Sequence, residues 1–153
     1  MSDKEIIIRL LLAVAIGGVI GFERERHRRA AGLRTHILVC IGAALITLTS
    51  LYIAENYSGL NRNCDPARVA AGIVMGIGFL GAGTIIRERA SVMGLTTAAS
   101  LWGVAGIGMA LGCGFYKAAI FAATITFVTL LVLGVFARKY LGKKKEAQFD
   151  IEG

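Results

Sequence analysis

Residues 68–102 read RVAAGIVMGIGFLGAGTIIRERASVMGLTTAASLW, and the first half of this stretch indicates the class of fold. Val69 to Ile86 carries no charged side chain and is about long enough to cross a bilayer as a helix. Each glycine inside it would cost a helix in water about 1 kcal/mol relative to alanine. On a helix these glycines fall on two opposite faces, which predicts close packing on both sides and a central place in a bundle. The glycines are Gly72, Gly76 and Gly83 on one face, and Gly78 and Gly81 on the other.

The composition indicates a protein embedded in a membrane. Apolar residues make up 56% of the 153 residues, and apolar runs recur along most of the chain. This share is too high for a soluble globular domain, so we expect an all-α, polytopic membrane protein with a bundle of about five transmembrane helices. The expected spans are roughly 5–22, 35–54, 67–86, 97–111 and 118–137, followed by a basic cytoplasmic tail at 138–153.

The net charge of +7 is spread over short runs between the apolar spans. This distribution reflects orientation in a membrane and argues against a nucleic-acid partner. With five spans, most of the 17 Lys and Arg side chains fall on one side. The positive-inside rule then places the N-terminus outside and the C-terminus in the cytoplasm.

The same topology gathers polar residues at the cytoplasmic ends of four spans. Spans 35–54 and 97–111 begin there, and their free N–H groups and helix dipoles favour negative charge. We expect a functional cluster at this face; the alternative is that its members only cap helices among lipid headgroups. The cluster consists of Glu23, Arg24, Arg34, His36, Thr84, Arg87, Thr96 and Thr97.

Glu23 carries the sharpest expectation within this cluster. An unpaired carboxylate just inside the membrane boundary is costly, whereas one beside guanidinium groups is stabilised. We therefore expect Glu23 to bond with Arg34, Arg87 or backbone N–H groups where span 35–54 or 97–111 begins. The alternative is an exposed headgroup-level side chain. Glu25, two residues further along, is expected to matter little.

Small residues recur on other spans and predict further packing faces. In span 5–22 they repeat at every fourth residue, and span 97–111 has a similar stripe. Trp102 is expected to pack in the core. The full set of expected helix-packing glycines is Gly17, Gly21, Gly72, Gly76, Gly78, Gly81, Gly83, Gly103 and Gly106.

No residue pattern predicts catalysis, a cofactor or a metal site. The run GIGFLGAG at 76–83 lacks the Lys-Ser/Thr ending of a phosphate-binding loop, although a locally unwound, ion-coordinating backbone is left open. None of the acidic residues is expected in the middle of a span, where a hard cation would need oxygen ligands. Pairing of Cys64 with Cys113 near the outer face is also left open.

Three segments carry more specific motifs: FERERHRRAAGLRTHILVCIGAAL, DPARVAAGIVMGIGFLGAGTII and GLTTAASLWGVAGIGMALGCG. In this order and spacing they resemble the MgtC/SapB family of bacterial inner-membrane proteins. The resemblance covers roughly Leu12 to Lys117 and implies about five spans. The chain departs from the family pattern at Gly72, Met75 and Thr96. We therefore expect a short member, without the soluble C-terminal domain of longer ones.

The resemblance implies a non-enzymatic role in adaptation to magnesium limitation and acid stress, and in virulence. Family members are thought to bind and restrain other membrane proteins, such as transporters and the proton-translocating ATP synthase. We therefore expect a membrane protein partner of unknown identity, with a homo-oligomer left open. The alternative is a transporter or channel, for which Mg²⁺ is the candidate ion.

Overall fold

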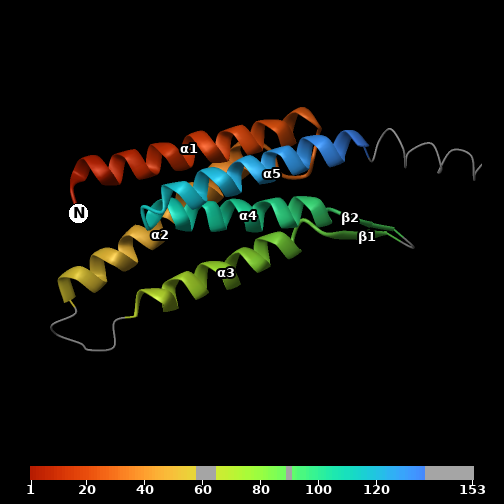
Figure 1. Cartoon of the computed structure of the whole chain (residues 1–153). Coiled ribbons are helices and arrows are strands. Elements are labelled where there is room, and N and C mark those ends of the chain that lie inside the picture. The colour runs from red at the N-terminus through yellow and green to blue at the C-terminus, as the bar shows by residue number, and fades with distance from the viewer. Residues whose placement is uncertain (58–64, 89–90, 137–153) are drawn as a thin grey trace, which may run out of the picture.

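A computed structural model describes residues 1–57, 65–88 and 91–136 of the chain. It is a bundle of five helices with a short hairpin between the third and fourth (Figure 1), which confirms the helical membrane fold expected from the sequence. Cys64 and the tail at 138–153 lie outside the described residues, so the cysteine pairing stays untested. The elements are α1 (Asp3–Arg26), α2 (Leu33–Tyr57), α3 (Pro66–Ala82), β1 (Ile86–Glu88), β2 (Ser91–Met93), α4 (Leu95–Gly112) and α5 (Tyr116–Phe136).

Four helices, α1, α2, α4 and α5, are long and apolar enough to cross a membrane. The remaining helix, α3, has 17 residues and ends at Ala82, four residues before the end at 86 that the sequence predicted. Thr84, Ile85 and Ile86 are β-branched and favour an extended backbone after the glycine-rich end of α3. The chain therefore leaves α3 and pairs Ile86 with Met93 in the antiparallel β1–β2 hairpin, which the sequence analysis did not foresee.

Local signals explain where the helices begin. Ser2 and Glu5 form a capping box at the start of α1, with Glu5 N donating to Ser2 Oγ over 3.4 Å. Asp65 Oδ1 accepts from Ala67 N over 2.9 Å, one residue after Pro66 opens α3. Gly94 precedes α4 with a φ of 90°, and a Cβ there would lie 1.9 Å from Thr84 O. Only glycine fits this turn out of the hairpin.

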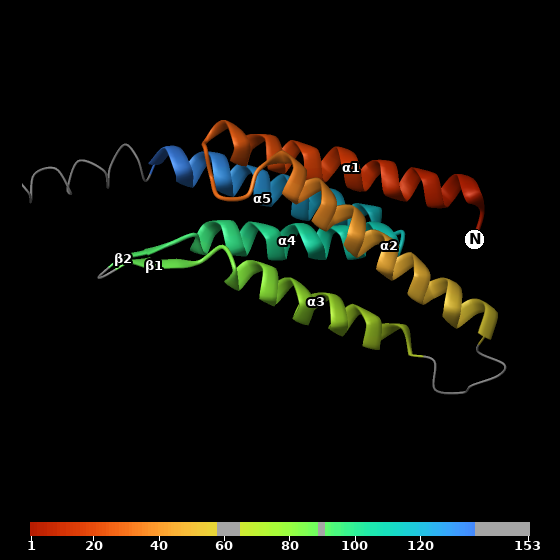
Figure 2. The ribbon, with the colours of Figure 1, turned by 180° about the vertical axis from the view of Figure 1, so that it is seen from behind.

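The centre of the bundle is α2, not the glycine-rich α3 that the sequence analysis placed there. In two opposite views, α1 and α4 run alongside α2 while α3 lies at the edge (Figures 1 and 2), and α3 packs chiefly on α4. The buried core accordingly joins Ile20 of α1, Cys40 of α2 and Val104 and Leu111 of α4. Burial agrees with this arrangement: of the 17 residues of α3, only Ile73, Ile77 and Gly81 are buried.

Close backbone contact between helices rests on four glycines facing α2. A Cβ on Gly17 or Gly21 of α1 would lie 2.9 Å from His36 O or Leu33 O. A Cβ on Gly108 or Gly112 of α4 would lie 2.3 Å from Cys40 O or 2.7 Å from Ala44 O. The first pair was expected from the sequence and the second was missed.

The other glycines that were expected to pack helices do not make such close backbone contacts inside the bundle. A Cβ at Gly81 would make ordinary contact with Ala98 Cβ at 3.5 Å, and at Gly83 it would meet only carbonyls of α3 itself. Trp102 is 56% exposed on α4, so its expected place in the core is wrong. A Cβ would meet open space at the remaining positions, which are Gly72, Gly76, Gly78, Gly103 and Gly106.

Gly108→Ala is expected to destabilise the bundle by about 1–3 kcal/mol, because its methyl group would press on the α2 backbone. Gly106→Ala, two residues earlier on the same helix, is the matched control, since a Cβ there meets nothing within 4 Å. Thermal unfolding of the detergent-solubilised protein measures both. Equal midpoints for the two variants would contradict the close approach of α4 to α2.

Candidate functional site at the basic end of the bundle

Glu23 lies near the end of α1 and is buried, with 4% of its surface exposed. Its Oε2 accepts from Nε of Arg24, which is 3% exposed, and its Oε1 lies 2.9 Å from His27 Nδ1. The predicted pairing of Glu23 with a cation is therefore present, but its partners are its own neighbours in α1. Arg34 and Arg87, the partners expected from the sequence, are both exposed.

The reason for this difference lies in the turn after α1. Arg28 has a φ of 50°, and Arg29 N bonds back to Arg24 O over 3.1 Å, so the chain folds over the end of its own helix. Oε1 of Glu23 lies beside His27, four residues on, at this same end of α1. The neighbouring Arg24 then supplies the charge that a buried carboxylate requires.

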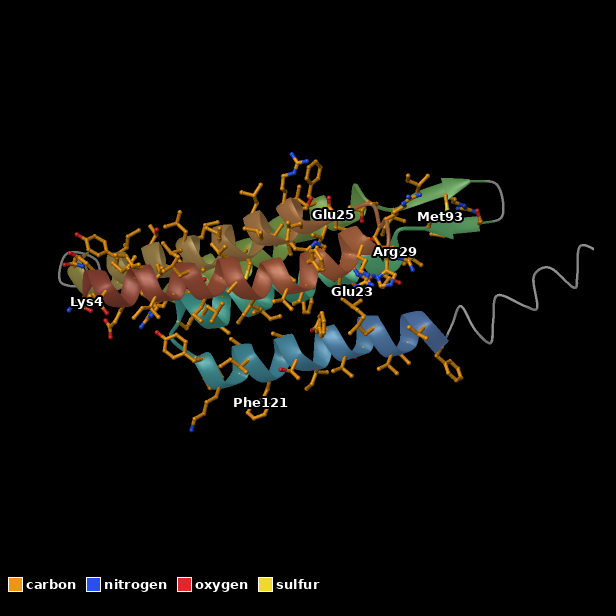
Figure 3. All side chains as sticks on the ribbon, turned by 90° about the horizontal axis from the view of Figure 1, so that it is seen from above. Lys4, Glu23, Glu25, Arg29, Met93 and Phe121 are labelled. Atoms are coloured by element: carbon orange, nitrogen blue, oxygen red, sulfur yellow. The ribbon has the colours of Figure 1, made fainter. Side chains whose placement is uncertain are left out.

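Glu25 has a structural role that the sequence analysis missed. Its Oε2 accepts from Leu33 N over 2.7 Å and so satisfies a free N–H group at the start of α2. Figure 3 shows Glu23 and Glu25 at the end of α1 nearest the hairpin. A Cβ on Gly32 would lie 2.1 Å from that oxygen, so any larger residue would push the Glu25 carboxylate away from the cap. The cap comes from eight residues upstream, which is why no local capping motif revealed it.

His36 and Ser100 join α2 to α4 inside the bundle. His36 is fully buried, with Nδ1 2.8 Å from Gly32 O and Nε2 3.0 Å from Ser100 Oγ. Ser100 Oγ in turn lies 2.8 Å from Thr97 O. A carbonyl can only accept, so Nδ1 carries a proton.

The single hydroxyl proton of Ser100 has two possible acceptors. With a neutral His36 it is donated to Nε2, whereas with a doubly protonated ring it is free to go to Thr97 O. The site therefore holds a proton-dependent hydrogen-bond arrangement. Thr97 itself is buried beside it in the first turn of α4.

The remaining members of the predicted cluster lie apart from this buried group. The Thr84 hydroxyl donates to Gly81 O, three residues earlier in the chain, over 2.8 Å. Arg87 is exposed on β1. Thr96 is exposed at the start of α4, and Arg34 is exposed at the start of α2. The structure thus divides the cluster into a buried part, with Glu23, Arg24, His36 and Thr97, and an outer part.

The electrostatics follow from this division. The Glu23–Arg24 pair is neutral as a unit inside the bundle, while the arginines of the outer part are exposed. Among the described residues, every buried side-chain nitrogen and oxygen has a hydrogen-bond partner, and no three His, Cys, Asp or Glu side chains lie close enough to hold a metal ion. The described surface at this end is consequently cationic, through Arg26, Arg28, Arg29, Arg34 and Arg87.

Comparison with known proteins assigns the family. The model of the MgtC family matches residues 10–139. This chain belongs to the MgtC family. It is 45% identical over 148 residues to a protein of Escherichia coli K12 named "Putative magnesium transporter YhiD", covering 96% of this chain and 69% of that protein.

Other relatives carry the two names of the family resemblance. Protein SapB of Bacillus subtilis is 38% identical over 151 residues, covering 97% of this chain and 65% of SapB. Protein MgtC of Salmonella typhimurium LT2 is 47% identical over 127 residues, covering 83% of this chain and 51% of MgtC. The chain thus spans between half and about two thirds of these relatives. No solved structure matches it.

Glu23→Ala is expected to lower the free energy of unfolding by about 3–5 kcal/mol, because it leaves the Arg24 guanidinium buried without its carboxylate. Glu25→Ala should cost about 1 kcal/mol through loss of the α2 cap. Glu55→Ala is the control: this side chain is exposed, and its ion pair with the N-terminal amine over 3.8 Å is worth at most about 1 kcal/mol.

The measurement is thermal or denaturant unfolding of the three purified variants. A Glu23→Leu, Arg24→Met double variant should be more stable than Glu23→Leu alone, since no unpaired charge stays buried. If Glu23→Ala and Glu55→Ala unfold alike, the Glu23 carboxylate does not stabilise the buried arginine.

Proposed function

We propose that this chain is a non-enzymatic protein of the bacterial inner membrane that binds another membrane protein during adaptation to magnesium limitation or acid stress. The basic end of the bundle, with its outer arginines, lies in the cytoplasm under the positive-inside rule, and the N-terminus lies outside. The partner is a transporter or an ATP synthase, the kinds of protein that the family resemblance implies. The name of the relative from Escherichia coli supports the link to magnesium.

The observation that carries the proposal is the outward face of α4. It is formed by Ala99, Trp102, Gly103 and Gly106, on the side of α4 away from the glycines that face α2. A Cβ on Gly103 or Gly106 would meet nothing within 4 Å, and the Trp102 ring is 56% exposed. Small residues allow another membrane helix to approach closely, and tryptophan is a frequent anchor in interfaces.

The buried polar groups fit a binding protein for a second reason. They are partnered within the described bundle. His36 and Ser100 connect α2 directly to the inner side of that helix. A partner on the outer face would therefore meet a helix whose position is already determined.

Photocrosslinking from position 102 in living cells tests the proposal. A crosslinking amino acid at this position should capture a membrane protein under low magnesium or acid conditions. Gly106→Leu should reduce the crosslinked product because its side chain occupies the surface that the partner helix approaches. Ala122→Leu, at an exposed position of α5, should leave the product unchanged. Equal yields from both variants would contradict docking on α4.

The alternative is a transporter or channel for Mg²⁺, which is favoured by the name of the relative from Escherichia coli. Proteoliposomes containing only this protein separate the two functions. The binding proposal predicts that Mg²⁺ influx, followed with an entrapped dye, equals that of empty liposomes. Influx that rises with the amount of protein and saturates with Mg²⁺ would establish the alternative in its place.

A further inference from the structure

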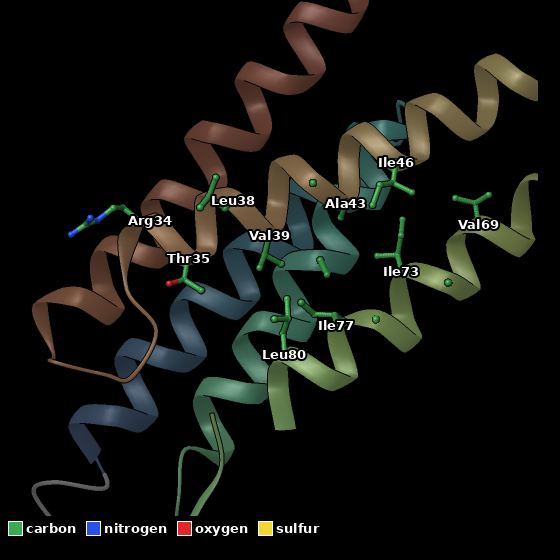
Figure 4. Close-up of a pocket in the computed structure, with 14 residues that line it drawn as sticks. Arg34, Thr35, Leu38, Val39, Ala43, Ile46, Val69, Ile73, Ile77 and Leu80 are labelled. Atoms are coloured by element: carbon green, nitrogen blue, oxygen red, sulfur yellow. The ribbon is translucent and has the colours of Figure 1, made fainter. Parts of the chain in front are cut away.

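An open groove of about 770 Å³ runs between α2 and α3 (Figure 4). Leu38, Val39 and Ile46 form its α2 wall, and Ile73, Ile77 and Leu80 form its α3 wall. Ala105 of α4 closes its base. It lies on a different part of the bundle from the outward face of α4, and nothing proposed for that face depends on it.

Glycines make the groove deep enough to hold a ligand. Gly42 lines it from α2, and Gly72 and Gly76 line it from α3. A Cβ at any of the three would meet nothing within 4 Å, so the space in front of each backbone is empty. The walls are otherwise aliphatic, and they offer an apolar chain contact along their length.

One end of the groove is cationic. Arg34 and Thr35 line it where α2 begins, and the Arg34 guanidinium points outward, away from the apolar walls (Figure 4). Arg34 is the one charged residue among those that line the groove. At the opposite end α2 and α3 are joined, because Ser50 Oγ donates to Pro66 O over 3.3 Å. The groove thus has a charged end at Arg34, and its apolar walls lead toward the end where α2 and α3 are hydrogen-bonded.

The length of the groove fits one leaflet of a bilayer. Along α2 it extends from Arg34 to Ile46, a rise of about 18 Å at 1.5 Å per residue. One leaflet contributes about 15 Å of the hydrocarbon core, whereas a whole transmembrane helix needs about 30 Å. A lipid tail therefore matches the groove better than a second helix does.

We propose that this groove binds an anionic phospholipid, with one acyl chain between α2 and α3 and the phosphate at Arg34. The outward direction of the guanidinium places its charge at headgroup level, as expected for a long basic side chain at a helix end. The hydroxyl of Thr35 and the exposed arginines of the 26–29 turn lie at the same end of the bundle and add hydrogen bonding and positive potential.

The test is native mass spectrometry of the full chain in detergent, titrated with dioleoyl phosphatidylglycerol or dioleoyl phosphatidylcholine. The wild type should bind phosphatidylglycerol more tightly. Arg34→Gln should lower that preference about fivefold, the effect of about one surface charge. Arg68→Gln, exposed near the start of α3 at the other end of the bundle, should leave it unchanged.

Gly76 and Gly78 provide a matched pair for the apolar part of the groove. Both face empty space, but only Gly76 lines the groove. Gly76→Leu should abolish tight binding of phosphatidylglycerol, and Gly78→Leu should have no effect.

Three results would overturn the proposal. Equal affinity of the wild type for the two lipids would mean that the groove does not select an anionic headgroup and that lipid contacts it non-specifically. Unchanged binding by Gly76→Leu would place the lipid elsewhere. Loss of a dimer, but not of lipid, in Gly76→Leu would make a second copy of the chain the occupant.

Discussion

The bundle depends on the approach of three helix backbones at van der Waals distance without intervening side chains. Along α2 the contacts follow in order: Gly21 of α1 lies on Leu33, Gly17 on His36 and Cys40, Gly108 of α4 on Cys40 and Ala43, and Gly112 on Ala44 and Thr47. In a lipid environment apolar surface gives no hydrophobic drive for association, so packing at this range is a main source of stability. The positions of α1, α2 and α4 follow from it.

This packing also determines where polar groups can be tolerated. Because α1 and α2 touch at Gly21 and Leu33, Glu23 and Arg24 at the end of α1 are covered and must neutralise each other. Because α2 and α4 touch at Cys40 and Gly108, His36 is sealed inside one turn earlier, and Ser100 reaches it from α4. The exposed charges at this end are those of Arg34 and of the arginines at positions 26, 28 and 29. A neutral interior beneath a cationic rim is the result.

Much of the fold could be predicted from composition and periodicity, because apolar length alone indicates membrane helices. The burial of Glu23 against a cation was also predictable, since the cost of an unpaired charge is general. Its partner was not, because the choice between Arg24 and Arg34 depends on a turn with a positive φ at Arg28 that no motif announces. The hairpin was missed because Ile85 and Ile86 are as apolar as the helix before them.

The number of glycines in α3 wrongly suggested that this helix lies at the centre of the bundle, and the reason is related. A glycine marks a position where a backbone can be approached, but the sequence does not say whether a helix of the same chain approaches it. At Gly108 it does; at Gly72 and Gly76 it does not. α3 is attached to α4 by the stripe that contains Ile73, Ile77 and Gly81, so the adjacent glycine stripe is turned toward the gap beside α2.

The groove is therefore a geometric consequence of how α3 is held. One stripe of α3 binds α4, its first residue is tied to Ser50, and the remaining width between α3 and α2 has no side chain to fill it. In water such a gap would collapse around its apolar walls. In a bilayer it is filled at little cost by an acyl chain, because the chain exchanges one apolar contact for another. Affinity for one lipid over another must then come from the charged end, and at that end Arg34 is the side chain that the groove offers.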